Sequence, residues 1–282
     1  MNIPTDTIVT AIHPFLPILL ALYSLFNAFY FLKKARVLEN TPPSKIRSAA
    51  QGYVELLGRS TLLPNHPISS QFTQKPCVWY GYTVEQFQSN NNGWDIIEQG
   101  ASFHPFLLTD ETGACFVLPE NAEIIPNATI TWRGDSRTPS PPPTSFWTSL
   151  FWGHLGQFRY TESRLELDSA LYLTGEFYTW QVNSAELNKY PELNLYAQDN
   201  HLDTVNVMVQ ITPKADEPYV ISTLPERSLV RRFKIKSFLY FIGFLIFVAF
   251  ATHPDLAWVQ QDLRNWAFKM KSFHPASTWF LK

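Results

Sequence analysis

Two long apolar segments without a formal charge constrain the fold of this chain more than any other feature. The first, IVTAIHPFLPILLALYSLFNAFYFL, spans residues 8–32, and the second, SFLYFIGFLIFVAFATHP, spans residues 237–254. A helix of about 20 mostly apolar residues is long enough to cross a bilayer. We therefore predict two transmembrane helices in an integral membrane protein, with a long region between them.

Each segment has an alternative interpretation. The first resembles a cleaved signal peptide, but its basic residues follow the apolar run and no small-residue cleavage site is evident. The second is near the lower length limit for a span, so a buried core helix is its alternative. Length and flanking charge favour an uncleaved anchor at residues 8–32 and a true second span.

Basic residues flank both spans on the side of the central region. Three follow the first span and four precede the second: Lys33, Lys34, Arg36, Arg231, Arg232, Lys234 and Lys236. Loops rich in Lys and Arg stay on the cytoplasmic side of a membrane. We expect a cytoplasmic central domain, with both termini on the opposite side. Beyond the second span, apolar residues recur at helical spacing over 255–275, which predicts an amphipathic helix lying in the membrane interface.

The central region carries the pattern of a β domain. Val78, Tyr80, Tyr82 and Val84 alternate with other residues, as in a half-buried strand. Similar short runs separated by turn residues occur at 52–58, 94–100, 106–118, 128–132, 170–180, 205–212 and 218–223. This spacing predicts a mainly β fold for residues 45–236, an antiparallel small barrel or a sandwich.

Residues 138–155 interrupt the strand pattern. The sequence TPSPPPT is typical of a polyproline II loop, either a stiff insertion or a partner-binding PxxP motif. The following SFWTSLFWGHL gives a short helix with one aromatic face, which either enters the headgroup layer or packs on the barrel. Further on, Thr223 and Glu226 predict the N-cap and third position of a helix that continues into the second span.

The stretch FLLTDETGACFVL raises the question of whether Asp110 is a catalytic acid. An aspartic-protease motif needs Asp, Thr or Ser, and Gly in succession, and Glu111 interrupts that order. A β-turn explains the residues more simply, because Asp at its first position bonds N–H groups ahead of it. We expect a hairpin in which Asp110 is the corner and Gly113 adopts a special turn conformation.

The chain offers no arrangement that nominates a metal, a cofactor or a catalytic group. Its seven histidines are scattered singly, and its two cysteines suit buried thiols better than ligands. Glu162 and Glu166 form a conceivable acid pair, but their spacing along a strand favours solvated or turn-bonded carboxylates. With 22 basic and 24 acidic residues, nothing indicates a nucleic-acid partner.

Several motifs in order resemble the GIDE domain, also called BAM (beside a membrane), the membrane-flanked domain of MULAN/MAPL-type E3 ubiquitin ligases and of many prokaryotic proteins. The resemblance covers residues 45–236 and runs through CVWYGYTVE, PFLLTDETG, and RYTE followed by LYLTG. It implies that the matching residues form a structural signature and not an active site: Gly52, Trp79, Tyr80, Phe106, Asp110, Gly113, Tyr160, Glu162 and Gly175.

The ligases of this family carry a zinc-binding RING after the second span. The residues that follow Thr252 here contain no cysteine, so we expect a RING-less, prokaryotic-like member. The function expected is that of a non-enzymatic membrane-anchored binding or scaffold module, whose partners are the lipid bilayer and an unidentified protein. The alternatives are an E3 ubiquitin-ligase component, as the resemblance implies, an unrecognised hydrolase, or a subunit of an export or envelope-stress complex.

Overall fold

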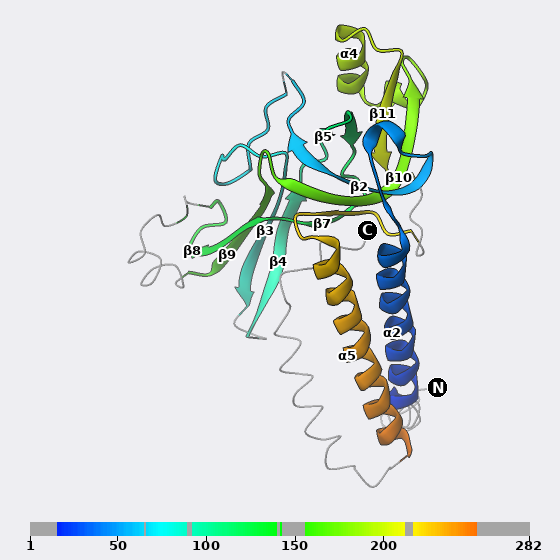
Figure 1. The fold of residues 1–282 in the computed structure, drawn as a ribbon. Helices are drawn as coiled ribbons and strands as arrows, with labels where there is room; N and C mark the ends of the chain where they lie inside the picture. Colours follow the sequence, from blue (N-terminus) through cyan, green and yellow to red (C-terminus); the bar gives the residue numbers. More distant parts are fainter. Residues whose placement is uncertain are drawn as a thin grey trace, which may run out of the picture. The chain divides into compact units, whose positions relative to one another are not determined.

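A computed structural model describes residues 16–64, 66–88, 92–139, 142, 156–211 and 217–252 (Figure 1). They form two compact units, a pair of long helices and a β domain over Thr41–Pro225. Residues 8–15 of the first predicted span, most of the insertion at 138–155 and the predicted helix at 255–275 lie outside the described residues.

The helix unit consists of α2 (Leu16–Asn40) and α5 (Glu226–Thr252). They run antiparallel side by side (Figure 1), with Glu39 near the end of α2 bonded to Lys234 near the start of α5. Both helices are long and apolar enough to cross a membrane. The described part of α2 continues past Leu32 to Asn40, so the first helix is not confined to residues 8–32.

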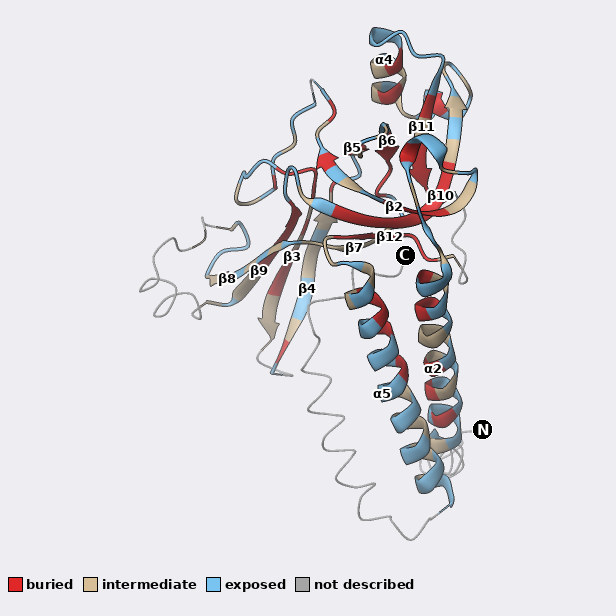
Figure 2. Cartoon of the chain, viewed as in Figure 1, coloured by how far each residue is buried: buried red, intermediate tan, exposed pale blue. Residues whose placement is uncertain are grey.

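Buried and exposed positions alternate along both helices (Figure 2); several buried ones carry small side chains, whereas many exposed ones are large and apolar. Ala21, Ser24 and Ala28 of α2 are buried, and the hydroxyl of Ser237 donates to the carbonyl oxygen of Ala28 at 2.7 Å. Small residues and such interhelical bonds are typical of membrane helices, because they let two backbones approach closely. The exposed apolar side chains include Leu19, Leu22, Phe26, Phe29, Phe238, Leu239 and Leu245.

The β domain is built on a closed five-stranded barrel, which confirms the prediction of a mainly β fold with a small barrel. Its strands are β2 (Gly52–Thr61), β5 (Phe106–Thr109), β6 (Ala114–Val117), β11 (Thr204–Val209) and β10 (Ala170–Gln181). They pair in that order, and β10 returns to pair with β2. All of these pairs are antiparallel except β6 with β11.

The long strand β10 closes the barrel. One edge pairs with β2 from Ala170 to Phe177. Its other edge pairs with β12 (Val220–Ser222) at Tyr172 to Thr174, and with β11 from Glu176 onward. The partner therefore changes at Gly175. Two short strands extend the sheet beyond the barrel, β1 (Pro43–Ser44) beside β2 and β7 (Glu123–Ile125) beside β12.

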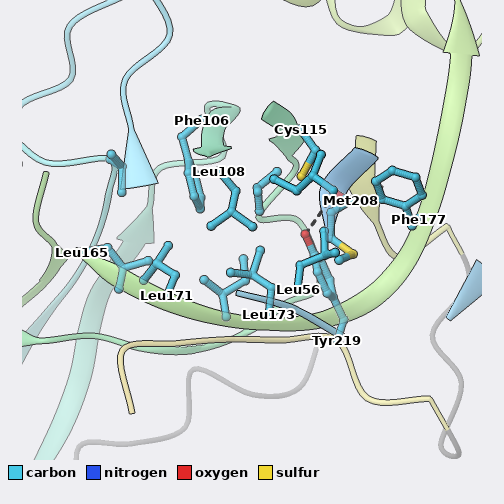
Figure 3. Packing of buried hydrophobic residues seen from close by; sticks show 14 of the residues in the cluster. Leu56, Phe106, Leu108, Cys115, Leu165, Leu171, Leu173, Phe177, Met208 and Tyr219 are labelled. Atoms are coloured by element: carbon cyan, nitrogen blue, oxygen red, sulfur yellow. Dashed lines mark hydrogen bonds between the residues drawn. The ribbon is translucent and has the colours of Figure 1, made fainter. Parts of the chain in front are cut away.

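Alternating apolar residues of the barrel strands meet in one core (Figure 3). Tyr219 enters it with its polar end satisfied, because its hydroxyl donates to the carbonyl oxygens of Leu118 and Met208 at 2.8 and 3.2 Å. The ring of Tyr219 packs beside β10, where a Cβ atom on Gly175 would lie 2.5 Å from its Cδ2. The other labelled core residues are Leu56, Phe106, Leu108, Cys115, Leu165, Leu171, Leu173 and Phe177.

A separate four-stranded sheet has the order β4 (Gly93–Ala101), β3 (Trp79–Gln88), β9 (Phe158–Leu165) and β8 (Ala128–Gly134). All three pairings are antiparallel. The register between β3 and β4 shifts at Val84, so β4 carries a bulge. One face of this sheet packs a small aromatic cluster of Phe72, Trp132, Tyr160 and their neighbours.

In the second half of the domain one helix was not predicted, and one local prediction is wrong. Helix α4 (Pro191–Asp199) was not expected. It directly follows the 3-10 turn η2 (Leu187–Lys189), whereas the other 3-10 turn, η1 (Ile46–Ser48), precedes β2. Helix α4 packs Leu193 and Ala197 against apolar residues of β6 and β11. Thr223 is not the N-cap of α5, because the helix begins at Glu226 and the Thr223 hydroxyl donates to Ile125.

Candidate functional site

Asp110 is the corner of the β5–β6 hairpin and also fastens that hairpin to η1. Its Oδ1 accepts hydrogen bonds from the backbone N–H groups of Thr112 and Gly113 at 2.7 and 2.9 Å. Its Oδ2 accepts one from the N–H of Ile46 at 2.9 Å. Burial disfavours the charged carboxylate, but a hydrogen bond from the Thr112 hydroxyl together with these backbone bonds outweighs it and lowers the pKa of Asp110. The lowered pKa suits a structural anion and not a proton donor near neutral pH.

Gly113 does not adopt the special conformation expected of it. Its φ angle lies outside the left-handed region, and a Cβ atom there would meet only the Ile46 side chain at an ordinary 3.7 Å. The positive φ of 105° belongs instead to Gly52, the first residue of β2. The glycine requirement in this part of the fold therefore lies at Gly52, where left-handed backbone favours a residue without Cβ.

Glu162 is fully buried and holds the loop that precedes β3. Its Oε2 accepts hydrogen bonds from the backbone N–H groups of Phe72 and Thr73 at 2.6 and 3.0 Å, and its Oε1 accepts from the Thr73 hydroxyl. Burial opposes the charge, but these donors outweigh it and lower the pKa of Glu162. Glu162 is therefore turn-bonded, whereas the Glu166 side chain is 52% exposed.

Arg164 completes the ionic anchor of this loop. Its Nη1 donates to Glu162 Oε1 at 3.1 Å and to the Thr73 hydroxyl at 2.8 Å. The pair is almost wholly out of water, with exposed side-chain fractions of 8% for Arg164 and 0% for Glu162. Removing either partner leaves the other charge buried, and that makes the pair important for stability.

The remaining signature residues also serve the fold. Phe106 lies in the barrel core and Trp79 extends that core to the start of β3, while Tyr80 is half-buried on the same strand. Tyr160 is buried in the aromatic cluster and donates its hydroxyl to the carbonyl oxygen of Ser136. The structure thus distributes the predicted signature over two sheets and gathers no subset of it at an open site.

The thiols are poor candidates for chemistry. Cys77 and Cys115 are both buried and free, and burial raises the pKa of Cys77 to about 11 and that of Cys115 still further. A thiol with a raised pKa is a weak nucleophile at neutral pH. Among the described residues, no group of three His, Cys, Asp or Glu side chains is placed to hold a metal ion.

Sequence reasoning missed a charged and aromatic cluster on the four-stranded sheet. Arg159 of β9 donates through Nε and Nη2 to Glu85 of β3, both at 2.5 Å. Its guanidinium and that of Arg133 lie over the indole of Trp94, 4.8 and 4.9 Å from the ring centroid. The strand register brings the three charged residues together, because Arg159 of β9 is paired with Glu85 on β3 and with Arg133 on β8. The arrangement orders the sheet surface near the end of β8.

Strand β8 provides the more regular edge of this sheet. Within the described residues it pairs only with β9, in an uninterrupted register from Ala128 to Gly134. Thr129 and Thr131 are exposed, and the strand contains neither Lys nor Pro. Edge strands usually carry such residues or a bulge that block further pairing. The bulge protects β4 at the other edge, whereas β8 has no bulge and its one charged residue, Arg133, lies over the ring of Trp94.

The charged residues of the helix unit gather at one end. From Leu16 to Leu32 and from Ser237 to Thr252 the two helices carry no formal charge. The other end holds two acidic residues, Glu39 and Glu226, and eight basic ones: Lys33, Lys34, Arg36, Arg227, Arg231, Arg232, Lys234 and Lys236. Lys34 and Lys236 also lie over the ring of Phe233, 5.0 and 5.9 Å from its centroid.

Three surface features stand out among the described residues: an apolar helix pair, its basic end and the edge of β8. Comparisons with protein-family models, with curated proteins and with solved structures give no match to this chain.

Proposed function

We propose that this chain is a two-span membrane protein whose β domain is cytoplasmic and serves as a binding or scaffold module for another protein. In this proposal both termini lie on the opposite side of the membrane. The motif resemblance to the GIDE/BAM family points the same way, and membership of that family is part of the proposal. The module catalyses nothing by itself.

The observation that carries the proposal is the distribution of side chains on the helix pair, which is the reverse of that in a water-soluble protein. Small and partly polar residues, among them Ser24, Ala28 and Ser237, are buried where the helices meet. Many bulky apolar side chains are exposed on the outside of the pair. In water this distribution would leave a large apolar surface exposed, whereas a bilayer solvates it. The one-ended basic cluster supports the orientation, because such residues are retained on the cytoplasmic side.

The β8 edge supports a role in protein binding. The first part of this edge, from Ala128 to Thr131, offers backbone N–H and C=O groups that an extended peptide pairs with by strand addition. Thr129 and Thr131 are exposed residues of this strand, and their hydroxyls are hydrogen-bonded across to those of Ser163 and Thr161 at 3.0 and 3.1 Å. These bonds hold the edge in an extended form, so a partner peptide meets a preorganised template.

Topology is tested with a thiol reagent that does not cross membranes. An Asp199→Cys substitution places a thiol at the exposed end of α4. We expect labelling in inverted membrane vesicles and none in intact cells. The unsubstituted chain is the control, since its own thiols are buried. Labelling of Asp199→Cys in intact cells would place the domain on the outer side.

Partner binding is tested by photo-crosslinking in the full-length protein in its membrane. A photoreactive phenylalanine analogue replaces Thr131 on β8, or Leu195, which is 53% exposed on α4, as the matched control. We expect a discrete crosslinked partner from position 131 and none from position 195. Crosslinks from position 195 alone, or from neither position, would contradict recognition at the β8 edge.

A further inference from the structure

The basic end of the helix unit contains a hollow of about 460 Å³ beside the first turns of α5. Three basic side chains line it, those of Arg227, Arg231 and Lys234. Their spacing of four and three residues places them on one face of the helix. The hollow therefore presents converging positive charge over about two helical turns.

The two arginines are the groups available to a ligand. Lys234 is already bonded to Glu39, with its Nζ 2.8 Å from Oε1. Arg227 and Arg231 are exposed and make no hydrogen bond or ion pair with the residues that the structure describes. Arg227 also lies in the first turn of α5, where the helix dipole adds to the attraction for an anion. Guanidinium groups suit phosphate oxygens because they donate two parallel hydrogen bonds.

The other side chains of the hollow indicate what else the ligand carries. Ile235 and Phe238 line it and are 48% and 63% exposed. They lie at the junction between the charged end of α5 and its uncharged stretch, which begins at Ser237. A free inorganic anion gains nothing from these apolar groups, whereas a lipid covers them with its acyl chain. The acidic Glu39 and Glu226 also line the hollow, so its three basic side chains leave only a modest basic excess.

We propose that this hollow binds the headgroup phosphate of an anionic phospholipid, with Arg227 and Arg231 on the phosphate oxygens and the acyl chain along Ile235 and Phe238. Basic pockets on membrane helices at the cytoplasmic surface bind anionic headgroups in this way. The inference rests on the proposed membrane insertion, and it adds a preference for one class of lipid.

The test uses the full-length protein in nanodiscs that contain equal amounts of phosphatidylglycerol and phosphatidylcholine with identical acyl chains. Native mass spectrometry after release from the disc measures which lipid stays bound. The test variant is Arg227→Gln with Arg231→Gln. The matched control is Arg36→Gln with Arg232→Gln, which removes the same charge from exposed positions outside the hollow.

We expect the wild type and the control to retain phosphatidylglycerol preferentially, and the test variant to lose that preference by about tenfold. Equal loss in both double variants, no preference in the wild type, or displacement of the lipid by equimolar glycerol phosphate would overturn the proposal. Insertion into the discs is scored separately. A protein that does not insert contradicts the membrane function itself, whereas one that inserts without lipid preference contradicts only this site.

Discussion

Asp110 and Ile46 join two segments that lie 64 residues apart in the chain, through a hydrogen bond of 2.9 Å from the Ile46 N–H to Asp110 Oδ2. The same carboxylate closes its own hairpin through its other oxygen. A single side chain therefore fixes both the turn between β5 and β6 and the entry of the chain into β2. The question raised by the sequence around Asp110 is answered by these partners, all of which belong to the fold.

Replacing Asp110 with alanine is expected to destabilise the protein by about 2 kcal/mol, because several hydrogen bonds to a charged acceptor are lost. The matched variant is Gly113→Ala in the same turn, where the added Cβ atom finds ordinary space. Thermal unfolding of the full-length protein in detergent, read by a fluorogenic maleimide that reacts as Cys77 and Cys115 become exposed, measures both. Equal stability of Asp110→Ala and wild type would contradict the structural role.

Breaking the buried pair of Glu162 and Arg164 is expected to cost more. Glu162→Ala leaves the buried Arg164 guanidinium with only the half-exposed carboxylate of Glu166, 3.7 Å away, and breaking a buried pair costs about 3–5 kcal/mol. Glu166→Ala, which removes a half-exposed carboxylate near the same arginine, is the control and is expected to change stability by less than about 1 kcal/mol. The same unfolding assay compares them, and similar losses in the two variants would refute the anchor.

Stability is also expected to fall in acid. The pKa values of Asp110 and Glu162 are lowered by folding from ordinary values of 3.8 and 4.5. Their contribution is therefore complete above these values and is lost as the pH falls through them to the lower folded pKa values. Melting temperatures measured from pH 7 to pH 3 should decline below about pH 5. The decline should be shallower in Glu162→Gln, and an unchanged slope would exclude this carboxylate as a cause.

The closed barrel gives a prediction at Gly175. A Cβ atom there would lie 2.5 Å from Tyr219 Cδ2 and 3.1 Å from Met208 Sδ. Tyr219 cannot turn aside without losing its hydrogen bonds to Leu118 and Met208. Gly175→Ala is thus expected to destabilise by about 1–3 kcal/mol through overpacking. A wild-type melting temperature for this variant, with Gly113→Ala again as reference, would show that the core yields more easily than its packing indicates.

The elements that the sequence predicted well are those whose signal is local. Alternation around Val84 and the turn residues after Thr109 identify strands, and the uncharged runs identify the two long helices. Helix α4 was missed because its inward residues are only Leu193 and Ala197, one helical turn apart. Two positions are too few for periodicity to distinguish a helix from a loop.

The partners of the buried charges were beyond local pattern. Glu162 reads as a surface carboxylate, but it is buried because a loop 89 residues earlier in the chain supplies Thr73 to it. The pairing of Glu85 with Arg159 likewise depends on the register of two strands separated by 74 residues. Barrel closure has the same origin, since β2 and β10 pair although more than a hundred residues separate them, as in the pair Ala170 and Arg59. Long-range pairing is decided by the whole packing and not by any one segment.

The helix unit provides the last prediction, which concerns its small-residue contact. Ala28 is buried against α5 and accepts the hydrogen bond of Ser237, whereas the neighbouring Phe29 is 62% exposed. Ala28→Leu inserts three carbon atoms where the backbones approach closely, so we expect the pair to separate or shift. The expected loss is about 1–3 kcal/mol. Phe29→Leu changes a side chain that faces outward and is expected to leave the pair intact.

The measurement is disulfide formation between cysteines placed at Ser24 and Gly243 in the membrane-bound protein, because a Cβ atom on Gly243 would lie 4.0 Å from Ser24 Cβ. That separation lies within the range that a disulfide requires. Crosslinking should be efficient in the otherwise unsubstituted chain and with Phe29→Leu, and weak with Ala28→Leu. Equal crosslinking in all three would mean that the small-residue contact does not determine helix pairing, and that another force holds α2 against α5.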